Sequence, residues 1–313
     1  MEMKFKKAIA IMAVVLTLAA SAPAAFAATE PEISSSQTVS LEDRNSEENI
    51  LIETDLETGE EKEVIVEPGQ DPDYYSPGST VIDSYPTPDF DSLGNIEQLA
   101  GTTEVYKSTQ PQRSICYLSL TYSNGKSYPG TGFIVGKNTV VTAGHCLHDA
   151  TLGKVTRVTV VPGKKQVADA PYGTFPTTKV AVPNKWANNQ DPKYDYGIIT
   201  VNSDILSAVG GVKWGYRATS GNELLGEKRV VQGYPEGRND QYFLAKPITQ
   251  AGDAFLYLGQ RAVPGMSGGP LFESKSSGIV RVAEGILSAG VGTETRCVRI
   301  TKEIYDAISL YAK

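Results

Sequence analysis

The chain has 313 residues, 40 % of them hydrophobic, and a formal net charge of −7 at pH 7. This length and apolar fraction exclude a wholly disordered or fibrous protein and allow a sizeable buried core. The charge is uneven: residues 28–97 hold 19 acidic and two basic residues, whereas the part from residue 98 onward holds eight more basic than acidic residues. No Gly-rich phosphate loop and no basic cluster with interleaved aromatics occurs, so we expect no nucleic-acid partner.

The first 27 residues have the pattern of a secretory signal peptide. Lysines lead an apolar run over residues 8–20, which ends in the small-residue sequence Ala25-Phe26-Ala27. The run is too short for a convincing membrane anchor, and we find no other stretch that could span a bilayer. We therefore expect a secreted, extracellular protein that is cleaved after Ala27 and has no membrane anchor.

Residues 28–97 are predicted to form an acidic pro-segment. Six prolines and a large excess of carboxylates indicate that this segment buries little and has no core of its own. Opposite charge would draw it to the basic part of the chain, so we expect it to be a partner of that part until it is removed. A solvated acidic linker is the alternative interpretation.

From residue 98 to 313 the sequence predicts one all-β domain with a C-terminal helix. Short runs rich in Val, Ile, Tyr and Thr alternate with Gly, Pro, Asn and Ser, which is typical of a sandwich or barrel. The predicted strands cover residues 114–122, 131–135, 139–142, 155–161, 196–201, 228–233, 241–246, 254–258, 269–272, 281–287 and 296–300. Thr301 can cap the final helix, whose apolar residues recur at helical spacing.

Three separated residues suggest nucleophilic catalysis. Ser267 lies among glycines, which leave its hydroxyl uncovered. His145, one of two histidines in the chain, closes a predicted strand, and Asp195 stands at the mouth of another. A serine hydroxyl needs an imidazole to accept its proton, and a carboxylate can hold that imidazole in the useful tautomer. Taken singly, each residue could instead be structural: a Gly/Ser turn, a structural histidine and a turn aspartate.

The motifs around these residues resemble a known family. They are Thr142-Ala143-Gly144-His145-Cys146, Asp195-Tyr196-Gly197 and Gly265-Met266-Ser267-Gly268-Gly269-Pro270. With Trp214-Gly215-Tyr216-Arg217 and the precursor plan, they make the chain from residue 101 onward similar to bacterial secreted serine proteases of the chymotrypsin fold, in their glutamyl endopeptidase (V8-like) branch.

This resemblance implies two six-stranded antiparallel β-barrels, over residues 104–208 and 209–313, with the active site between them. It also implies a zymogen whose mature chain begins near Gln98, and peptide-bond hydrolysis through an acyl-enzyme. The backbone N–H groups of Gly265 and Ser267 would form the oxyanion hole, and Ser288 would hydrogen-bond Asp195. Substrates would be proteins or peptides, without a cofactor, and we expect a monomer.

The specificity pocket departs from the resemblance. Leu287 stands where glutamyl endopeptidases commonly have a histidine that meets the substrate carboxylate. The strand through residues 286–290, which ends at Gly290, would line the pocket, and Arg261, six residues before Ser267, falls where the fold places the residue at the pocket base. A guanidinium there could pair with a carboxylate, so we expect a preference for Glu or Asp before the scissile bond. The alternatives are a surface arginine with apolar specificity, or a protease-fold binding protein or toxin with restricted activity.

Three cysteines leave at least one unpaired. The family often links the cysteine after the catalytic histidine to one at the position of Gly130. Cys116 would face Gly130 if the hairpin were centred on residue 123, so we predict a Cys116–Cys146 disulfide and a reduced, buried Cys297. Three free buried cysteines are the alternative. The His-Glu-x-x-His pattern of zinc proteases is absent, and we expect no metal.

Overall fold

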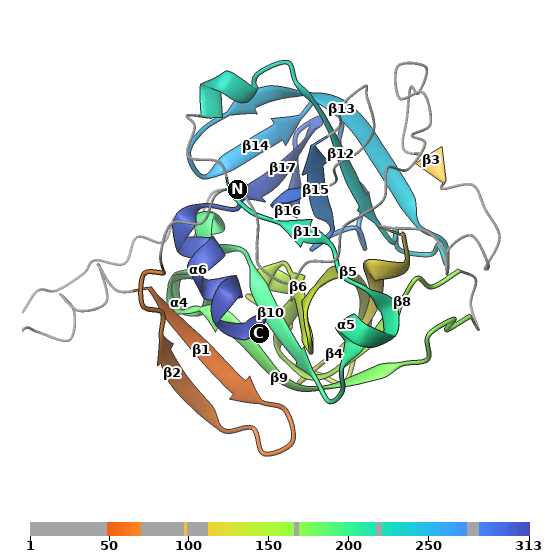
Figure 1. Cartoon of the computed structure of the whole chain (residues 1–313), viewed down its shortest axis with the longest axis vertical. Helices are drawn as coiled ribbons and strands as arrows, with labels where there is room; N and C mark the ends of the chain where they lie inside the picture. The colour runs from red at the N-terminus through yellow and green to blue at the C-terminus, as the bar shows by residue number, and fades with distance from the viewer. Residues whose placement is uncertain (1–48, 70–96, 99–111, 166–168, 217–220, 274–281) are drawn as a thin grey trace, which may run out of the picture. The chain divides into compact units, whose positions relative to one another are not determined.

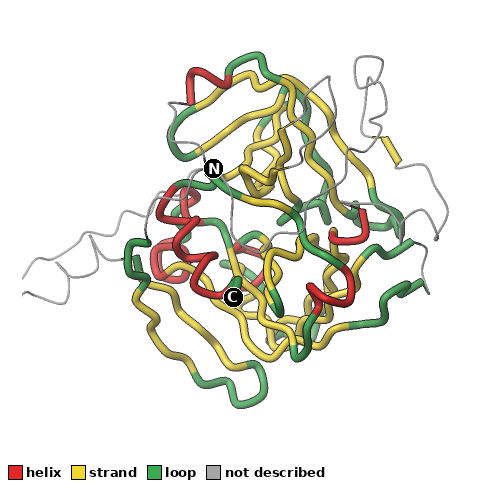
Figure 2. The backbone as a smooth tube through the Cα atoms, in the orientation of Figure 1, coloured by secondary structure: helices red, strands yellow, loops and turns green. Residues whose placement is uncertain are grey.

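The computed structural model describes residues 49–69, 97–98, 112–165, 169–216, 221–273 and 282–313. The predicted signal peptide lies outside these residues. Strands dominate the described chain, as the yellow segments of Figure 2 show. They form two sheets, each of which closes into a barrel of six antiparallel strands. The predicted fold class, two such barrels and a C-terminal helix, is confirmed.

The first barrel contains the strand that precedes His145 and the strand that follows Asp195. Its strands pair in the order β9, β10, β6, β5, β4 and β8, and β8 pairs back with β9. They are β4 (Ile115–Tyr122), β5 (Ser127–Gly136), β6 (Thr139–Thr142), β8 (Gly153–Pro162), β9 (Phe175–Pro183) and β10 (Gly197–Val201). Alternate residues of β4 are buried, as expected for a strand with one face on a core. A short strand β7 (His148–Asp149) pairs antiparallel with the first residues of β8.

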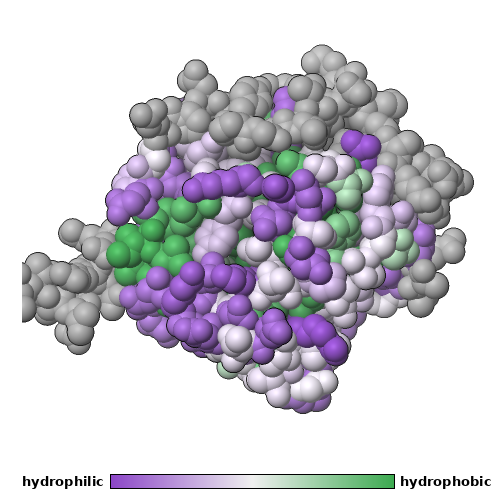
Figure 3. All heavy atoms as spheres, turned by 60° about the horizontal axis from the view of Figure 1, so that its bottom comes forward, coloured by the Kyte–Doolittle hydropathy of each residue, from purple (hydrophilic) through white to green (hydrophobic). Residues whose placement is uncertain are grey.

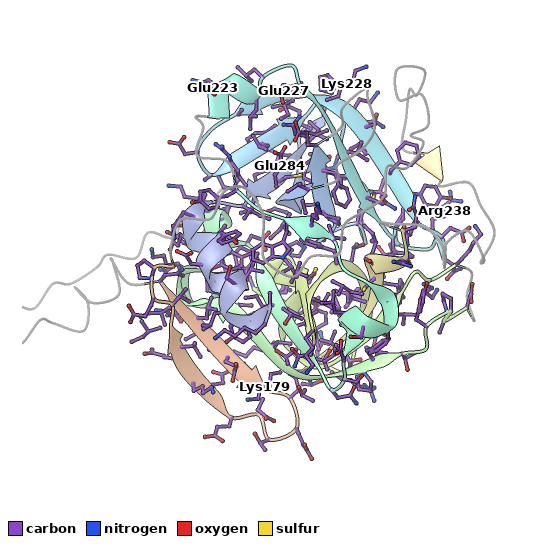
Figure 4. All side chains as sticks on the ribbon, in the orientation of Figure 1. Lys179, Glu223, Glu227, Lys228, Arg238 and Glu284 are labelled. Atoms are coloured by element: carbon purple, nitrogen blue, oxygen red, sulfur yellow. The ribbon has the colours of Figure 1, made fainter. Side chains whose placement is uncertain are left out.

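The second barrel pairs in the order β16, β15, β12, β13, β14 and β17, and closes through β16 and β17. The strands are β12 (Lys228–Gly233), β13 (Tyr242–Ala251), β14 (Phe255–Leu258), β15 (Pro270–Glu273), β16 (Val282–Val291) and β17 (Glu294–Arg299). Two short strands join its sheet, β11 (Lys213–Trp214) beside β16 and β3 (Glu97–Gln98) beside β13. The buried Arg229 on β12 pairs with Glu284 on β16, labelled in Figure 4, so two strands of this barrel are linked by charge.

The helices are short except for the last one. They are α3 (Gly144–Leu147), α4 (Asn184–Asn189), α5 (Ile205–Val209) and α6 (Lys302–Tyr311), with 3-10 turns η1 (Gln112–Ser114), η2 (Pro192–Tyr194) and η3 (Gly221–Leu224). Helix α6 begins as predicted, because the Thr301 side chain accepts a hydrogen bond from the Ile304 N–H. Ile304 and Ile308 join the core of the first barrel, and the Thr139 hydroxyl donates to the Tyr311 carbonyl at 2.6 Å. The chain therefore returns to the first barrel after completing the second.

A hairpin from the predicted pro-segment joins the first barrel. Strands β1 (Ile50–Asp55) and β2 (Glu61–Ile65) pair with each other, and β1 pairs antiparallel with β9 (Figure 1). Leu51 is fully buried, so this part of the segment buries more than its composition indicates. Residues 49–69 hold seven acidic residues and one basic residue, but Ile50 and Leu51 on β1 and Val66 after β2 are buried apolar side chains.

The predicted disulfide is wrong: Cys116, Cys146 and Cys297 are all free and buried. Cys116 lies opposite Gly132, and Gly130 lies opposite Leu118. The hairpin between β4 and β5 is therefore centred one residue later than assumed, which shifts the pairing by two residues. The Cys146 sulfur does lie near Gly130, but Leu118 occupies the position across from that glycine. The reduced, buried Cys297 agrees with the prediction.

The face of the molecule in Figure 3 is largely hydrophilic, with a hydrophobic area at its left side. Among the described large apolar residues, those that stand out as exposed are Ile65, Leu225, Val263 and Val291. No helix in the described part of the chain is both long enough and apolar enough to span a bilayer.

Candidate active site

The pairing of β6 with β10 brings His145 and Asp195 to the same end of the first barrel. Thr142, the last residue of β6, lies opposite Gly197, the first residue of β10. The chain leaves β6 into helix α3, which carries His145, and enters β10 from η2, at whose C-terminus Asp195 stands. A Cβ atom on Gly197 would lie 2.6 Å from Leu147, so a glycine there allows α3 to pack closely on β10.

The imidazole of His145 contacts the carboxylate of Asp195 directly. Nδ1 lies 3.0 Å from Oδ2 and 3.1 Å from Oδ1, and the His145 backbone N–H also donates to Oδ1 at 2.9 Å. The His145 side chain is 27 % exposed and that of Asp195 only 3 %. Because Nδ1 is engaged by the carboxylate, Nε2 is the ring nitrogen left to exchange a proton with a neighbouring group.

The two groups shift each other's proton affinity. Burial alone would lower the pKa of His145, but the adjacent Asp195 carboxylate outweighs it and raises that pKa well above the usual value. Burial alone would raise the pKa of Asp195, but His145 and the hydrogen bonds to the carboxylate lower it. The carboxylate therefore stays ionised near neutral pH and favours a proton on the imidazole.

Ser288 and Arg296 extend this arrangement into the second barrel. The Ser288 hydroxyl donates to Asp195 Oδ2 at 2.6 Å, the contact that the resemblance implied. The same hydroxyl accepts from Arg296 Nη2 at 3.1 Å, and the guanidinium lies 5.1 Å from the Phe255 ring centre. Sequence reasoning missed Arg296. Its place on β17, opposite Ala289 and next to Ser288, follows only from the pairing of β16 with β17.

Ser267 lies in the loop between β14 and β15, and Thr131 on β5 anchors that loop to the first barrel. The Thr131 N–H donates to the Ser267 carbonyl at 2.9 Å, and its hydroxyl donates to the Gly265 carbonyl at 2.9 Å. The Cys146 sulfur lies 3.8 Å from the Ser267 carbonyl, so the residue after His145 is next to Ser267. The loop is therefore fixed beside helix α3 from the opposite barrel.

Glycines make this close approach possible. Gly268 has φ +84°, and a Cβ atom there would lie 2.2 Å from the Thr131 carbonyl oxygen. Gly265 has φ +88°, and a Cβ atom there would lie 2.4 Å from the Glu236 backbone nitrogen. Neither the Gly265 nor the Ser267 N–H donates a hydrogen bond to the described part of the chain. Two N–H groups flanking the serine are thus available to a developing oxyanion.

The predicted pocket residues lie in three different surroundings. Leu287 is 2 % exposed and packs in the core of the second barrel with Met266 and Cys297. Arg261 is exposed, and its Nη1 donates to the Gly292 carbonyl at 3.1 Å. A Cβ atom on Gly290 would lie 2.7 Å from Arg261 Nε, so the arginine and the predicted pocket strand are in contact. Ser288 faces Asp195 instead.

The trypsin family matches residues 105–308, which is most of the chain and includes both barrels. The chain belongs to the trypsin family. A solved structure of a Glu endopeptidase in complex with MPD superimposes with a TM-score of 0.59 at 22 % identity, covering 71 % of this chain and 98 % of that one. At this identity the superposition supports the fold alone.

Two curated relatives come from Bacillus. An extracellular metalloprotease of Bacillus subtilis is 31 % identical over 205 residues, which are 64 % of each protein. A glutamyl endopeptidase of Bacillus licheniformis is 30 % identical over 210 residues, which are 64 % of this chain and 63 % of the relative. The match therefore spans somewhat less than two thirds of each relative's length.

The name of the first relative implies a metal ion, which we tested against the residues of this trypsin-family chain. The described residues contain no group of three or more His, Cys, Asp or Glu side chains that could hold one. We derive no step through a metal.

Proposed function

We propose that the protein is a secreted serine endopeptidase, made as a zymogen, that prefers acidic residues before the scissile bond. The observation that carries the proposal is the continuous arrangement of Ser288, Asp195 and His145, beside a Ser267 loop in which the Gly265 and Ser267 N–H groups donate no hydrogen bond to any described residue. Such an arrangement provides a nucleophile, a base, an orienting carboxylate and donors for an oxyanion.

In the proposed reaction, His145 Nε2 takes the proton of the Ser267 hydroxyl while Oγ forms a bond to the substrate carbonyl carbon. The N–H groups of Gly265 and Ser267 stabilise the negative oxygen of the tetrahedral intermediate. The C–N bond then breaks, and His145 gives its proton to the leaving amine. Water attacks the acyl-enzyme by the same route in reverse, which releases the acid and restores Ser267. Asp195 stabilises the imidazolium in each half of the reaction.

Acidic specificity is supported by Arg261 and by the charge of the catalytic part of the chain. Arg261 contacts Gly290, on the strand expected to line the pocket, and the part from residue 98 onward is basic. The glutamyl endopeptidase of B. licheniformis is among the relatives. Apolar specificity remains the second candidate, because Leu287 is an apolar residue at the position where a carboxylate-binding histidine is usual.

Maturation is proposed to remove residues 28–97 after export. Glu97 and Gln98 form strand β3, which pairs with Phe243 and Tyr242 of β13. A protease binds its substrate as an extended strand, so the bond between Glu97 and Gln98 must first leave β13. Processing would then require a local opening of this pair of strands rather than unfolding of a barrel.

A fluorophosphonate probe tests the proposal, because the oxygen of an activated serine attacks its phosphorus and displaces fluoride, which leaves a phosphonylated serine. The processed protein should be labelled on Ser267, and Ser267→Ala should not be labelled. A peptide library varied at the residue before the scissile bond then separates Glu or Asp preference from Phe or Leu preference. A labelled protein that cleaves no peptide would favour the alternative of a binding protein or toxin with restricted access. An unlabelled, folded protein would exclude the serine mechanism.

A further inference from the structure

We propose that the β1–β2 hairpin, residues 49–69, is a docking module that stays bound to the first barrel as a separate chain after the precursor has been cut. The inference rests on the maturation proposed above, but its test does not require the protein to be a protease. The occupant of the surface is thus a segment of the same chain, and the surface is the outer edge of β9 with the residues around it.

The backbone of β9 offers this edge because its two halves have different neighbours. Phe175 and Pro176 at its start pair with β8. Residues 177–181 pair with β10, which occupies one side of the strand, and the described part of the barrel provides no strand for the other side there. Strand β1 pairs with the other side over residues 179–183. An open strand edge presents unpaired N–H and C=O groups and invites pairing with any extended segment. The hairpin therefore closes an edge that the barrel itself leaves open.

Apolar side chains of the hairpin lie opposite apolar residues of β9. Leu51 and Ile52 lie opposite Pro183 and Val182, and Leu51 is 0 % exposed. Ile52 and Thr54 enclose a cavity of about 20 Å³ with Leu147, His148, Val180 and their neighbours, roughly the room of one water molecule. Leu147 of helix α3, two residues after His145, therefore faces the hairpin, and departure of the hairpin would expose this side of the helix that carries His145.

Charges also match. Glu53 on β1 is 9 % exposed and lies 3.0 Å from Lys62 Nζ on β2, 3.3 Å from Lys179 Nζ on β9 and 3.0 Å from the Tyr311 hydroxyl on α6. Figure 4 shows Lys179 at the side of β9 that faces the hairpin. Lys154 on β8 pairs with Glu61. A segment with six more acidic than basic residues thus meets basic groups from two strands of a basic domain.

The two ends of the hairpin are held by helix α6. Asn49 Nδ2 donates to the Glu303 carbonyl at 2.9 Å, and Lys302 Nζ donates to the Gly69 carbonyl at 2.8 Å. The proposed cleavage site is paired with β13 of the second barrel, whereas all of these contacts are with the first barrel. A cut at residue 97 therefore breaks none of the contacts that hold the hairpin.

The test uses residues 28–313 with Ser267→Ala, so that the chain cannot cut itself, and with a recognition sequence for an added specific protease placed between residues 80 and 90. After cutting, gel filtration at neutral pH should show the N-terminal fragment eluting with the rest of the chain in a one-to-one ratio. A fragment that elutes separately at once would overturn the proposal.

Matched variants identify the contacts that retain the fragment. Glu53→Gln should speed its release by about tenfold or more, because it removes the negative charge that pairs with Lys179 of the barrel, whereas Glu63→Gln on the exposed face of β2 should not. Leu51→Asp should release the fragment, and Ile65→Asp, at a side chain that is 56 % exposed, should not. If Leu51→Asp fails to fold, the glutamate pair decides. Equal release rates for the two glutamate variants would contradict the proposed surface.

Discussion

Thr131 of the first barrel holds Ser267 of the second, through a hydrogen bond of 2.9 Å from its N–H to the serine carbonyl. Its hydroxyl donates to the Gly265 carbonyl and accepts from the Tyr234 N–H, both at 2.9 Å. The Thr142 hydroxyl in turn donates to the Thr131 carbonyl at 2.7 Å. A single buried residue thus fixes the loop that carries Ser267 relative to β6, the strand that leads to His145.

Replacing Thr131 by Val keeps its shape and removes the hydroxyl. Two buried backbone groups lose their partner, which should cost about 1–3 kcal/mol each in unfolding free energy. Displacement of the Ser267 loop should lower kcat on a peptide substrate by roughly 10- to 100-fold. Thr139→Val is the matched control, because the hydroxyl of this buried threonine bonds only the Tyr311 carbonyl among the described residues. It should lose stability and keep kcat, and an equal loss of kcat in both variants would contradict the proposed role of Thr131.

The pairing of His145 with Asp195 should determine the pH below which activity is lost. His145 must be neutral to accept the Ser267 proton, and its pKa is raised by the carboxylate despite burial. Activity should therefore fall as pH decreases through a midpoint above about 6.5, the ordinary pKa of histidine. The pH dependence of kcat/KM measures this midpoint, and a midpoint below the ordinary value would contradict the pairing.

Arg296, which reaches Asp195 through Ser288, should affect the pH at which activity is lost. Its guanidinium bonds Ser288, which bonds Asp195, so its positive charge disfavours a second positive charge on His145. Arg296→Met should therefore raise the pKa of His145 and move the midpoint of the pH dependence upward by about half a pH unit. Arg296→Lys should restore most of the position, and Lys228→Met, an exposed residue on β12, should leave it unchanged (Figure 4). If the midpoint of the pH dependence does not change in Arg296→Met, the charge of the arginine does not act on His145 and the residue has a packing role only.

The fold and the Ser267, His145 and Asp195 motifs could be predicted because each depends on a local pattern: alternating strands, a Gly-rich loop, a residue at a strand end. Contacts set by strand pairing could not. A shift of two residues in the β4–β5 register separates Cys116 from Gly130. The Asn124-Gly125 turn, in which Gly125 has φ +78°, centres the hairpin on Asn124 instead of Ser123, and the assumed register did not take that turn signal into account. Arg296 contacts Ser288 only because β16 pairs with β17. The hairpin of residues 49–69 was not predicted, because the many acidic residues of this segment indicated that it would bury little.

The three cysteines should react as thiols. Burial raises the pKa of Cys116 and Cys297, so in the folded protein they should resist alkylation at neutral pH. In denaturant without a reductant, mass spectrometry after iodoacetamide treatment should show three adducts. A single adduct would indicate that two of them form a disulfide and would restore the pairing of Cys116 with Cys146 as a possibility.

Arg261 decides between the two specificities. Its guanidinium is exposed, bonds only the Gly292 carbonyl among the described residues, and lies against Gly290. One such group facing a substrate carboxylate contributes about 1.5 to 3 kcal/mol, or roughly one to two decades in relative rate. Arg261→Ala should therefore lower kcat/KM on peptides with Glu before the scissile bond by that factor and leave peptides with Leu almost unchanged. Lys246→Ala, on the same barrel, controls for the loss of overall positive charge, which affects only the encounter with substrate. Equal losses on Glu and Leu peptides in Arg261→Ala would mean that the arginine does not meet the substrate carboxylate, and the second candidate, a preference for a hydrophobic substrate residue, would then be favoured.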